Sequence, residues 1–270
     1  MRWENLRQSA NVQDLRGGRG LAIGGGGIGL VVVLLAALLY GVDPRQLLDS
    51  QPAQSQYPQQ TRTADNRAAD TGQRFVSAVL GSTEDAWSKI LPQQAGIRYS
   101  APQLVLYSGQ ISSACGYTSS AVGPFYCPGD RKVYLDLGFF NELSREFRAP
   151  GDFAQAYVIA HEVGHHVQNL LGTMDRMPSG NNQASVALEL QADCYAGIWA
   201  NFAQQQGVVE TGDAEEALRA ASAVGDDMIQ RRTQGYVVPE SFTHGSARQR
   251  MEWFSRGMQS GDMRQCQTFR

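Results

Sequence analysis

An HEVGH run at residues 161–165 lies inside an apolar stretch, 154–171, whose pattern predicts one buried helix. On a helix, positions i and i+4 share a face, so His161 and His165 can direct imidazole nitrogens to a common point. This spacing indicates a Zn²⁺ site. Glu162 projects about 100° round the helix, toward the open side of such a metal, where it could take the proton of a metal-acidified water. The run therefore predicts peptide or amide hydrolysis; the alternative is a helix with unrelated surface histidines.

Two further features of this helix favour the metal site. Gly164 costs about 1 kcal/mol relative to alanine in a helix, so we expect another element to approach the backbone there. The chain has only 4 histidines, and three of them fall in this helix. His166 is rotated one residue away from His165, so we expect it to pack or hydrogen-bond beside the site and not to bind metal.

A third ligand should come from another segment, because catalytic zinc usually has three protein ligands and one water. Residues 184–206 predict a long helix, starting around Asn182, in which Glu189 and Asp193 share a face. Two carboxylates on an otherwise apolar helix repel each other unless a cation or a donor lies between them. We expect Glu189 to bind the metal and Asp193 to accept the N–H of His161. The alternative is a solvated acidic pair.

Near the carboxyl end, His244 opens a last helix that continues through Phe254, after a structural helix predicted from about 213 to 231. Peptide cleavage places negative charge on an oxygen, and a donor aimed at that oxygen is worth several kcal/mol. His244, or an adjacent arginine such as Arg250, could be this donor. His244 could also be an ordinary loop histidine beside a helix cap, and Arg250 a structural support.

Length and charge limit the class of protein. A chain of 270 residues suggests one or two domains and is long enough for a packed core. The net charge is −3, and the scattered Lys and Arg form no basic stripe of the kind that nucleic-acid binding needs. We therefore exclude nucleic acid as a partner.

The amino-terminal region predicts a membrane anchor. Residues 1–20 are polar and predict a disordered tail, whereas 21–40 carry no charge and are about long enough to cross a bilayer. A cleaved signal peptide is the alternative; we favour an uncleaved anchor because the apolar run exceeds a signal-peptide core and no clear cleavage site follows. Arginines before the segment place the tail in the cytoplasm. Residues 41–71 predict a flexible linker and 72–270 the catalytic domain.

Within that domain the apolar spacing of residues 73–91 predicts a helix, broken in two at Gly81-Ser82-Thr83. Residues 103–108 predict a strand. Residues 123–126 and 132–136 predict two strands joined by a turn, just before the motif helix. These strands could form the edge on which an extended peptide pairs, or they could be an ordinary core hairpin.

The four cysteines fit no CxxC zinc pattern. A disulfide between Cys115 and Cys127 is plausible outside the cytoplasm, and Cys194 and Cys266 would then form the other pair. Four cysteines allow three connectivities, and the spacing alone does not decide among them.

The chain resembles the bacterial family of neutral zinc metallopeptidases, which are membrane-anchored members of the zincin superfamily. The resemblance rests on HEVGHHVQ at 161–168, ELQADCYAG at 189–197 and THGSARQR at 243–250, together with the amino-terminal apolar segment and Cys115 and Cys127. The HExxH plus ExxxD arrangement also resembles the gluzincin branch. The resemblance implies His161, His165 and Glu189 as ligands, Glu162 as the base and Asp193 as the residue that orients His161. Gly245 departs from related membrane-associated peptidases, which have proline at that position.

We therefore expect an α+β, mainly helical zincin-like metallopeptidase domain with a small antiparallel sheet, one bound Zn²⁺, and one transmembrane helix before it. We expect a single-pass protein of the bacterial inner membrane with its domain on the periplasmic side, acting on a peptide or protein substrate. Two alternatives stay open, a catalytically silent zinc-stabilised adaptor of the cell envelope and a small-molecule amidase.

Overall fold

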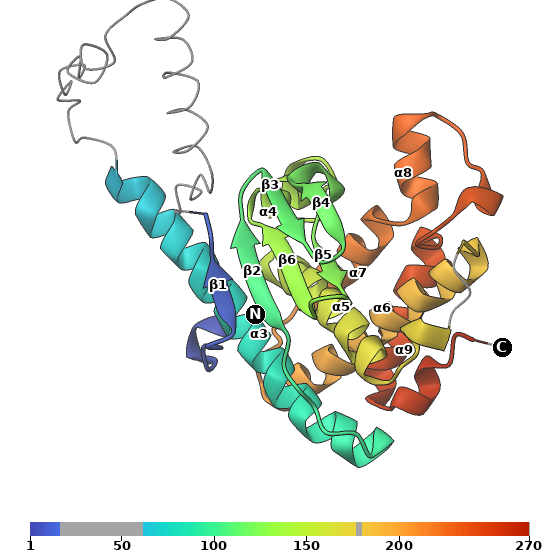
Figure 1. The fold of residues 1–270 in the computed structure, drawn as a ribbon, viewed down its shortest axis with the longest axis horizontal. Helices are drawn as coiled ribbons and strands as arrows, with labels where there is room; N and C mark the ends of the chain where they lie inside the picture. The colour runs from blue at the N-terminus through green and yellow to red at the C-terminus, as the bar shows by residue number, and fades with distance from the viewer. Residues whose placement is uncertain (17–61, 177–179, 270) are drawn as a thin grey trace, which may run out of the picture. The chain divides into compact units, whose positions relative to one another are not determined.

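The computed structural model describes residues 1–16, 62–176 and 180–269. Met1–Arg16 and Ala69–Arg270 form one compact unit, and the second unit, Gly17–Ala68, is described only where α3 begins. The helices of the described part are α3 (Arg62–Ala95), α4 (Gly138–Arg145), α5 (Asp152–Leu170), α6 (Asn182–Gln205), α7 (Asp213–Ala223), α8 (Asp226–Thr233) and α9 (Ala247–Ser260). The strands are β1 (Val12–Asp14), β2 (Gln103–Tyr107), β3 (Gln110–Ser113), β4 (Gly116–Ser119), β5 (Phe125–Cys127) and β6 (Lys132–Asp136). The predicted α+β class with a predominance of helix is confirmed (Figure 1).

The main sheet is mixed and has the strand order β1-β2-β6-β5. β1 and β6 both run parallel to β2, whereas β5 runs antiparallel to β6. The prediction of an antiparallel sheet is therefore correct only for the β5–β6 hairpin and for the separate β3–β4 hairpin. The parallel pairs join strands far apart in the chain, and a single sequence carries no local signal for such pairing.

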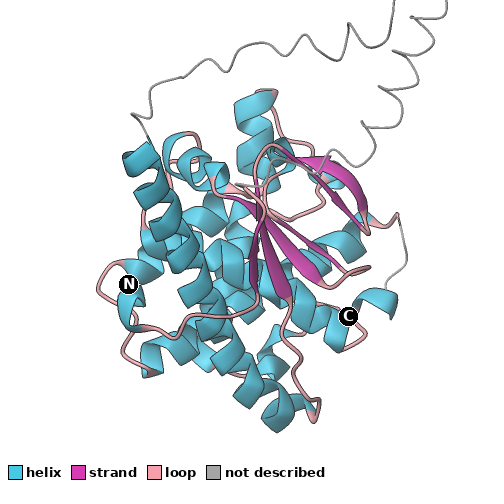
Figure 2. Ribbon diagram, turned by 60° about the vertical axis from the view of Figure 1, so that its left-hand side comes forward, coloured by secondary structure: helices cyan, strands magenta, loops and turns pink. Residues whose placement is uncertain are grey.

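Both faces of the sheet are buried, in separate clusters. Leu104, Leu106, Val133 and Leu135 join the large core formed with the helices. Val105, Tyr107, Tyr134 and Cys127 project to the other face and form a smaller cluster with side chains near the β3–β4 hairpin. This alternation is what the two-residue period of a strand requires. Figure 2 shows these few strands among the helices that make up most of the described chain.

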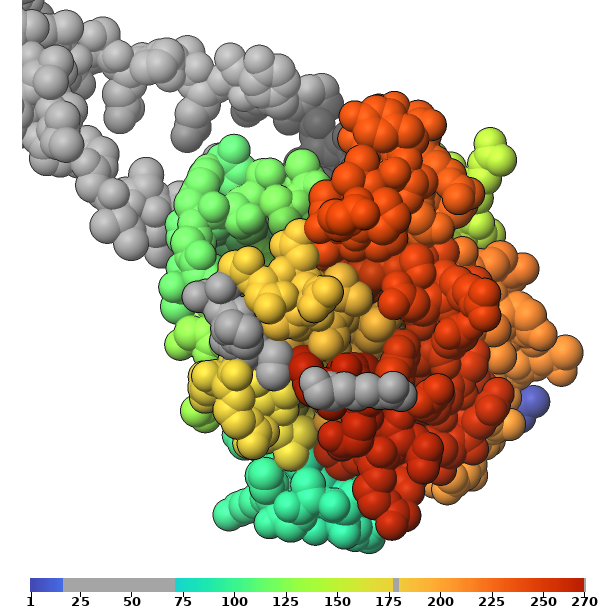
Figure 3. All heavy atoms as spheres, turned by 90° about the vertical axis from the view of Figure 1, so that its right-hand side faces the viewer, coloured from blue at the N-terminus to red at the C-terminus, as the bar shows by residue number. Residues whose placement is uncertain are grey.

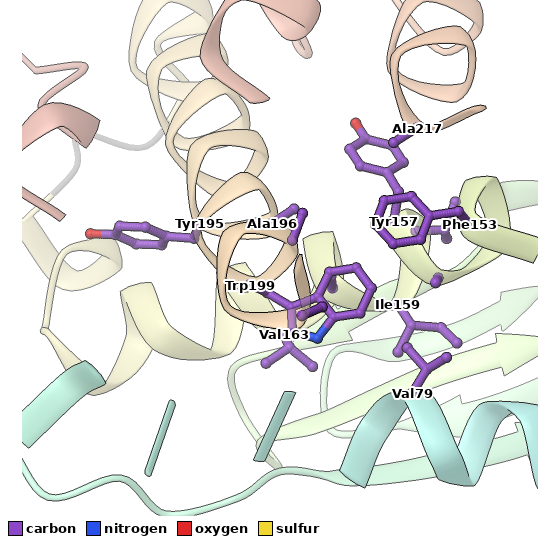
Figure 4. Packing of buried hydrophobic residues seen from close by; sticks show 14 of the residues in the cluster. Val79, Phe153, Tyr157, Ile159, Val163, Tyr195, Ala196, Trp199 and Ala217 are labelled. Atoms are coloured by element: carbon purple, nitrogen blue, oxygen red, sulfur yellow. The ribbon is translucent and has the colours of Figure 1, made fainter. Parts of the chain in front are cut away.

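The core between α5 and α6 is closely packed. Phe153 and Trp199 stack with ring centroids 5.5 Å apart, and Figure 4 shows Trp199 reaching from α6 toward the α5 side chains. A Cβ on Gly164 would lie 2.9 Å from the carbonyl oxygen of Ala192, a distance that real Cβ atoms essentially never show. The expectation that another element approaches Gly164 is thus confirmed. This close approach brings the ligand-bearing faces of α5 and α6 together.

Helix α3 is continuous through Gly81, so the prediction of a break there is wrong. A Cβ at Gly81 would lie 2.3 Å from the carbonyl oxygen of Arg7. Glycine is needed at this point because the amino-terminal segment crosses the helix, and not because the helix ends. The helix also begins at Arg62, inside the range predicted as a flexible linker.

Residues 1–16 are ordered, contrary to the prediction of a disordered tail. β1 pairs with β2 from Val12↔Leu104 to Asp14↔Leu106, and the Arg7 guanidinium pairs with Glu84 on α3. These contacts join residues 1–16 to the domain that follows residue 72. The predicted span, 21–40, lies outside the described residues, and no helix that the structure describes is long and apolar enough to cross a bilayer.

The single helix predicted from 213 to 231 is two helices, α7 and α8, separated at Val224 and Gly225. The break turns the chain so that Asp226 faces the 243–245 loop, where its Oδ2 accepts three backbone N–H groups. Apolar periodicity continues across the break, which is why the sequence pattern does not reveal it.

Two disulfides are formed, Cys115–Cys127 and Cys194–Cys266. The first ties the end of β5 to the β3–β4 turn, and the second ties α6 to the carboxyl-terminal segment. Of the three possible connectivities, the structure has the one that pairs Cys115 with Cys127 and Cys194 with Cys266.

Candidate metal centre

Three predicted ligands converge between α5 and α6. Nε2 of His161 lies 3.2 Å from one carboxylate oxygen of Glu189, and Nε2 of His165 lies 3.3 Å from the other. One ligand atom from each residue lies within 4.8 Å of the others, a separation that fits a shared ion. The three side chains are nearly buried, so water competes little for these atoms.

Each imidazole uses its other nitrogen to bind an acceptor. Nδ1 of His161 lies 2.8 Å from a carboxylate oxygen of Asp193, which can only accept, so Nδ1 carries the proton. Nδ1 of His165 lies 2.9 Å from Oε1 of Gln168. The Gln168 amide nitrogen donates to the carbonyl of Leu188, which fixes its oxygen toward His165. In the neutral form of each ring, Nε2 is therefore the nitrogen that is left to bind a metal beside Glu189.

Gln168 was not predicted as a site residue. It stands three residues after His165 on the same helix, and this spacing was available in the sequence as a signal. Its side chain is completely buried and also bonds Gln191 of α6. The amide therefore links the two ligand-bearing helices and orients one of the ligands.

Arg250 is buried and lines the same cavity as the ligands, and its guanidinium is bonded to a carboxylate. Its Nε and Nη2 bond the two carboxylate oxygens of Asp193 at 2.8 and 2.9 Å. The Tyr157 hydroxyl donates to the same carboxylate at 2.5 Å. These contacts hold the Asp193 carboxylate from two sides.

The pKa values show that the site attracts positive charge. Burial lowers the pKa of His161, but Asp193 and Glu189 outweigh it and raise that pKa to about 10. Burial raises the pKa of Glu189, yet the two histidines hold it well below its ordinary range. Burial also raises the pKa of Asp193, but Arg250 and His161 outweigh it and lower that pKa. A proton or a metal cation at the point of convergence satisfies this excess of negative charge, so the donor set fits Zn²⁺.

Glu162 lines a cavity of about 470 Å³ beside the converging ligands. Within the described part of the chain its carboxylate has no hydrogen-bond partner, and burial raises its pKa. An unpaired carboxylate at the wall of a cavity is free to exchange a proton with a molecule inside it. Figure 3 shows the golden start of α6 next to the orange-red segment from α8 to His244; both contribute to the wall of this cleft.

His244 is half exposed and lines the same cleft. Its Nδ1 lies 3.2 Å from Asp226, and this hydrogen bond is the main cause that raises the pKa of His244. Asp226 was not predicted as a site residue, because the sequence pattern places it inside a longer helix. Both hydrogen bonds of the imidazole are made by Nδ1, and Nε2 of His244 has no hydrogen-bond partner among the described residues.

His166 is buried away from the ligands, as expected. Its Nε2 lies 2.6 Å from the carbonyl oxygen of Ser100 and must donate, so Nδ1 accepts from the Tyr126 hydroxyl. Burial lowers the pKa of His166 to about 4, so the ring is neutral. His166 holds α5 against the sheet and takes no part in the site.

The chain matches the protein family described as "putative neutral zinc metallopeptidase" over residues 1–269. It is 47% identical to the uncharacterized protein YpfJ of Escherichia coli K12, over 100% of this chain and 99% of that protein. It is 46% identical to the uncharacterized protein Rv2575 of Mycobacterium tuberculosis, over 86% of this chain and 85% of that protein. No solved structure matches the chain.

Proposed function

The chain belongs to the family of neutral zinc metallopeptidases, and from this membership and the geometry of its site we propose that it hydrolyses peptide bonds with one bound Zn²⁺. The observation that carries the proposal is the convergence of His161, His165 and Glu189 beside an unpaired Glu162. A purely structural zinc site more usually closes its fourth position with a protein ligand. Here the three candidate ligands and Glu162 line one cavity, which leaves room for a water at the fourth position of the metal.

His161, His165 and Glu189 would hold the metal, which when bound lowers the pKa of a ligated water and polarises a carbonyl oxygen. Glu162 accepts the proton from the attacking water and later delivers it to the leaving amine. Asp193 and Gln168 hold the two imidazoles in the orientation that directs Nε2 to the metal.

His244 is the donor that we propose for the negatively charged oxygen of the reaction. It lines the cleft, and Asp226 raises its pKa and fixes its ring by bonding Nδ1. The side of the ring that carries Nε2 is then available to the substrate oxygen.

The substrate would lie along β5. This strand is at the edge of the sheet, and Phe125 and Tyr126 line the cleft. An extended peptide can add to such an edge through its backbone. The cleft is otherwise lined largely by apolar side chains, including Phe139, Phe147 and Ile229, which favours a bulky apolar residue next to the cleaved bond.

We further propose that the domain works in an oxidising compartment, outside the cytoplasm. The two disulfides support this location, since such bonds are rare in reducing compartments. Residues 1–16 would share that compartment, because β1 pairs with β2.

The test is a comparison of Glu162→Gln with the wild-type full chain, in metal content and in cleavage of a peptide library containing bulky apolar residues. We expect equal zinc content and a loss of about 10²-fold to 10⁴-fold in activity. If both proteins bind zinc and neither cleaves any peptide, the chain is a zinc-stabilised adaptor. If only small amides are cleaved, it is an amidase.

A further inference from the structure

A second hollow, of about 950 Å³, lies between the end of α4 and helices α7 and α8. These helices are green-yellow and orange in Figure 1. We call this hollow the basic groove, because five arginines line it and only two carboxylates, those of Glu146 and Glu215, accompany them. The arginines are Arg145, Arg148, Arg219, Arg231 and Arg232.

The lining of the basic groove keeps an excess of positive charge, since five arginines face two carboxylates. Among the described residues no carboxylate lies within 4.0 Å of any of the five guanidinium groups, whereas Arg248, also exposed, pairs with Glu252 at 2.7 Å. Arg232 donates to two backbone carbonyls, those of Glu146 and Ala223. Because the whole chain has a net charge of −3, the groove is opposite in sign to the protein that carries it.

The basic groove adjoins the catalytic cleft. The ring of Phe147 lines both hollows, and the Arg232 guanidinium stacks on that ring with its carbon 4.7 Å from the centroid. A polypeptide bound in the cleft can therefore continue into the groove over one aromatic side chain.

We propose that the basic groove binds an acidic stretch of the polypeptide substrate, at a distance from the cleaved bond. The proposal rests on the proposed peptidase function and adds a substrate class to it, proteins in which acidic residues flank an apolar cleavage site. Charge complementarity identifies an anionic ligand. The hollow shape and the apolar side chains of Leu218, Met228 and Met251 fit a peptide better than the flat surface of an anionic bilayer.

The binding test uses the full chain carrying Glu162→Gln, zinc-loaded and in neutral detergent. Two fluorescein-labelled decapeptides alternate leucine with either glutamate or glutamine, and anisotropy measures their affinity. We expect the glutamate peptide to bind more tightly, with an advantage that falls as salt rises. Arg219→Gln together with Arg231→Gln should weaken the binding of the glutamate peptide about tenfold, since each exposed charge pair raises affinity by a factor of up to about five.

The control is Arg74→Gln together with Arg98→Gln, which removes the same charge from exposed arginines outside the basic groove. Equal binding of both peptides, or equal weakening by the two double variants, would overturn the proposal. So would binding of phosphatidylglycerol vesicles that depends on Arg219 and Arg231 while the glutamate peptide fails to bind.

A cleavage test separates this proposal from the proposed function. The wild-type chain receives one apolar peptide extended at either end by four glutamates or four glutamines. We expect a higher kcat/KM for the glutamate peptides. The variant with Arg219→Gln and Arg231→Gln should lose that advantage and should cleave the glutamine peptides at the wild-type rate. If no peptide is cleaved while the charge-dependent binding persists, the peptidase function fails and the groove still binds acidic peptide. Equal cleavage of both sets by wild type overturns the groove as a determinant of substrate.

Discussion

Arg250 and Asp193 form a two-point ion pair inside the protein, with Nε 2.8 Å from Oδ2 and Nη2 2.9 Å from Oδ1. Their side chains are 4% and 0% exposed. Asp193 also accepts from His161, and Nη2 of Arg250 itself lies 3.3 Å from Nδ1 of that imidazole. Through this pair α9 stabilises the orientation of an imidazole on α5.

Arg250→Ala should destabilise the protein by about 3–5 kcal/mol, because it leaves the Asp193 carboxylate buried without its main partner. Urea unfolding of the full chain measures the change. Arg248→Ala is the control, since that arginine lies on the same helix, is exposed, and pairs with Glu252. A loss of stability no greater than that of the control would show that the buried pair contributes little.

Gln168→Ala should lower zinc affinity about 10-fold to 100-fold, because His165 loses the acceptor that fixes its ring. Competition with a chromogenic chelator measures the affinity. Gln155→Ala, on the same helix and outside the cleft, should leave it unchanged. Unaltered affinity in Gln168→Ala would mean that packing alone orients His165.

The pairing of His244 with Asp226 predicts a pH dependence. The pKa of His244 is raised above its ordinary value of 6.5, chiefly by the Asp226 hydrogen bond. A raised pKa in the folded state means that the stabilisation is complete below the unfolded pKa and is lost as pH rises through the folded pKa. If protonated His244 also serves as the donor, kcat/KM should fall over the same range.

Asp226→Asn should move that alkaline fall to lower pH. Titration of the imidazole resonances by NMR measures the shift directly, with His166 as the internal reference because its buried ring does not contact Asp226. An unchanged His244 titration in Asp226→Asn would remove the basis of the proposed pairing.

Gly81→Ala tests the packing of the amino-terminal segment. In an isolated helix the change should stabilise by about 1 kcal/mol. In the observed fold the added Cβ would lie 2.3 Å from the Arg7 carbonyl oxygen, so we expect destabilisation of about 1–3 kcal/mol instead. Hydrogen exchange should also accelerate at the amide of Ser9, which bonds Ser77 on α3. Net stabilisation would indicate that residues 1–16 do not pack on the helix.

The sequence by itself determined the elements whose signal is local. The histidines at i and i+4 predict a shared face for His161 and His165, and the same spacing pairs Glu189 with Asp193. Side-chain direction on a helix follows from its period alone, so these residues could be named before any contact was known. The strands β2, β5 and β6 were predicted for a similar reason, since each is a short apolar or aromatic run next to turn residues.

Only the tertiary structure decided which segments meet. The parallel pairing of β1 with β2, the break that brings Asp226 under His244, and the burial of Arg250 against Asp193 each join residues far apart in the chain. Gly81 shows the difference most directly. Its local preference is to interrupt a helix, but in the fold the absence of a Cβ admits the Arg7 backbone and the helix continues. Close packing between distant segments outweighed local propensity there, and no window of sequence contains both partners.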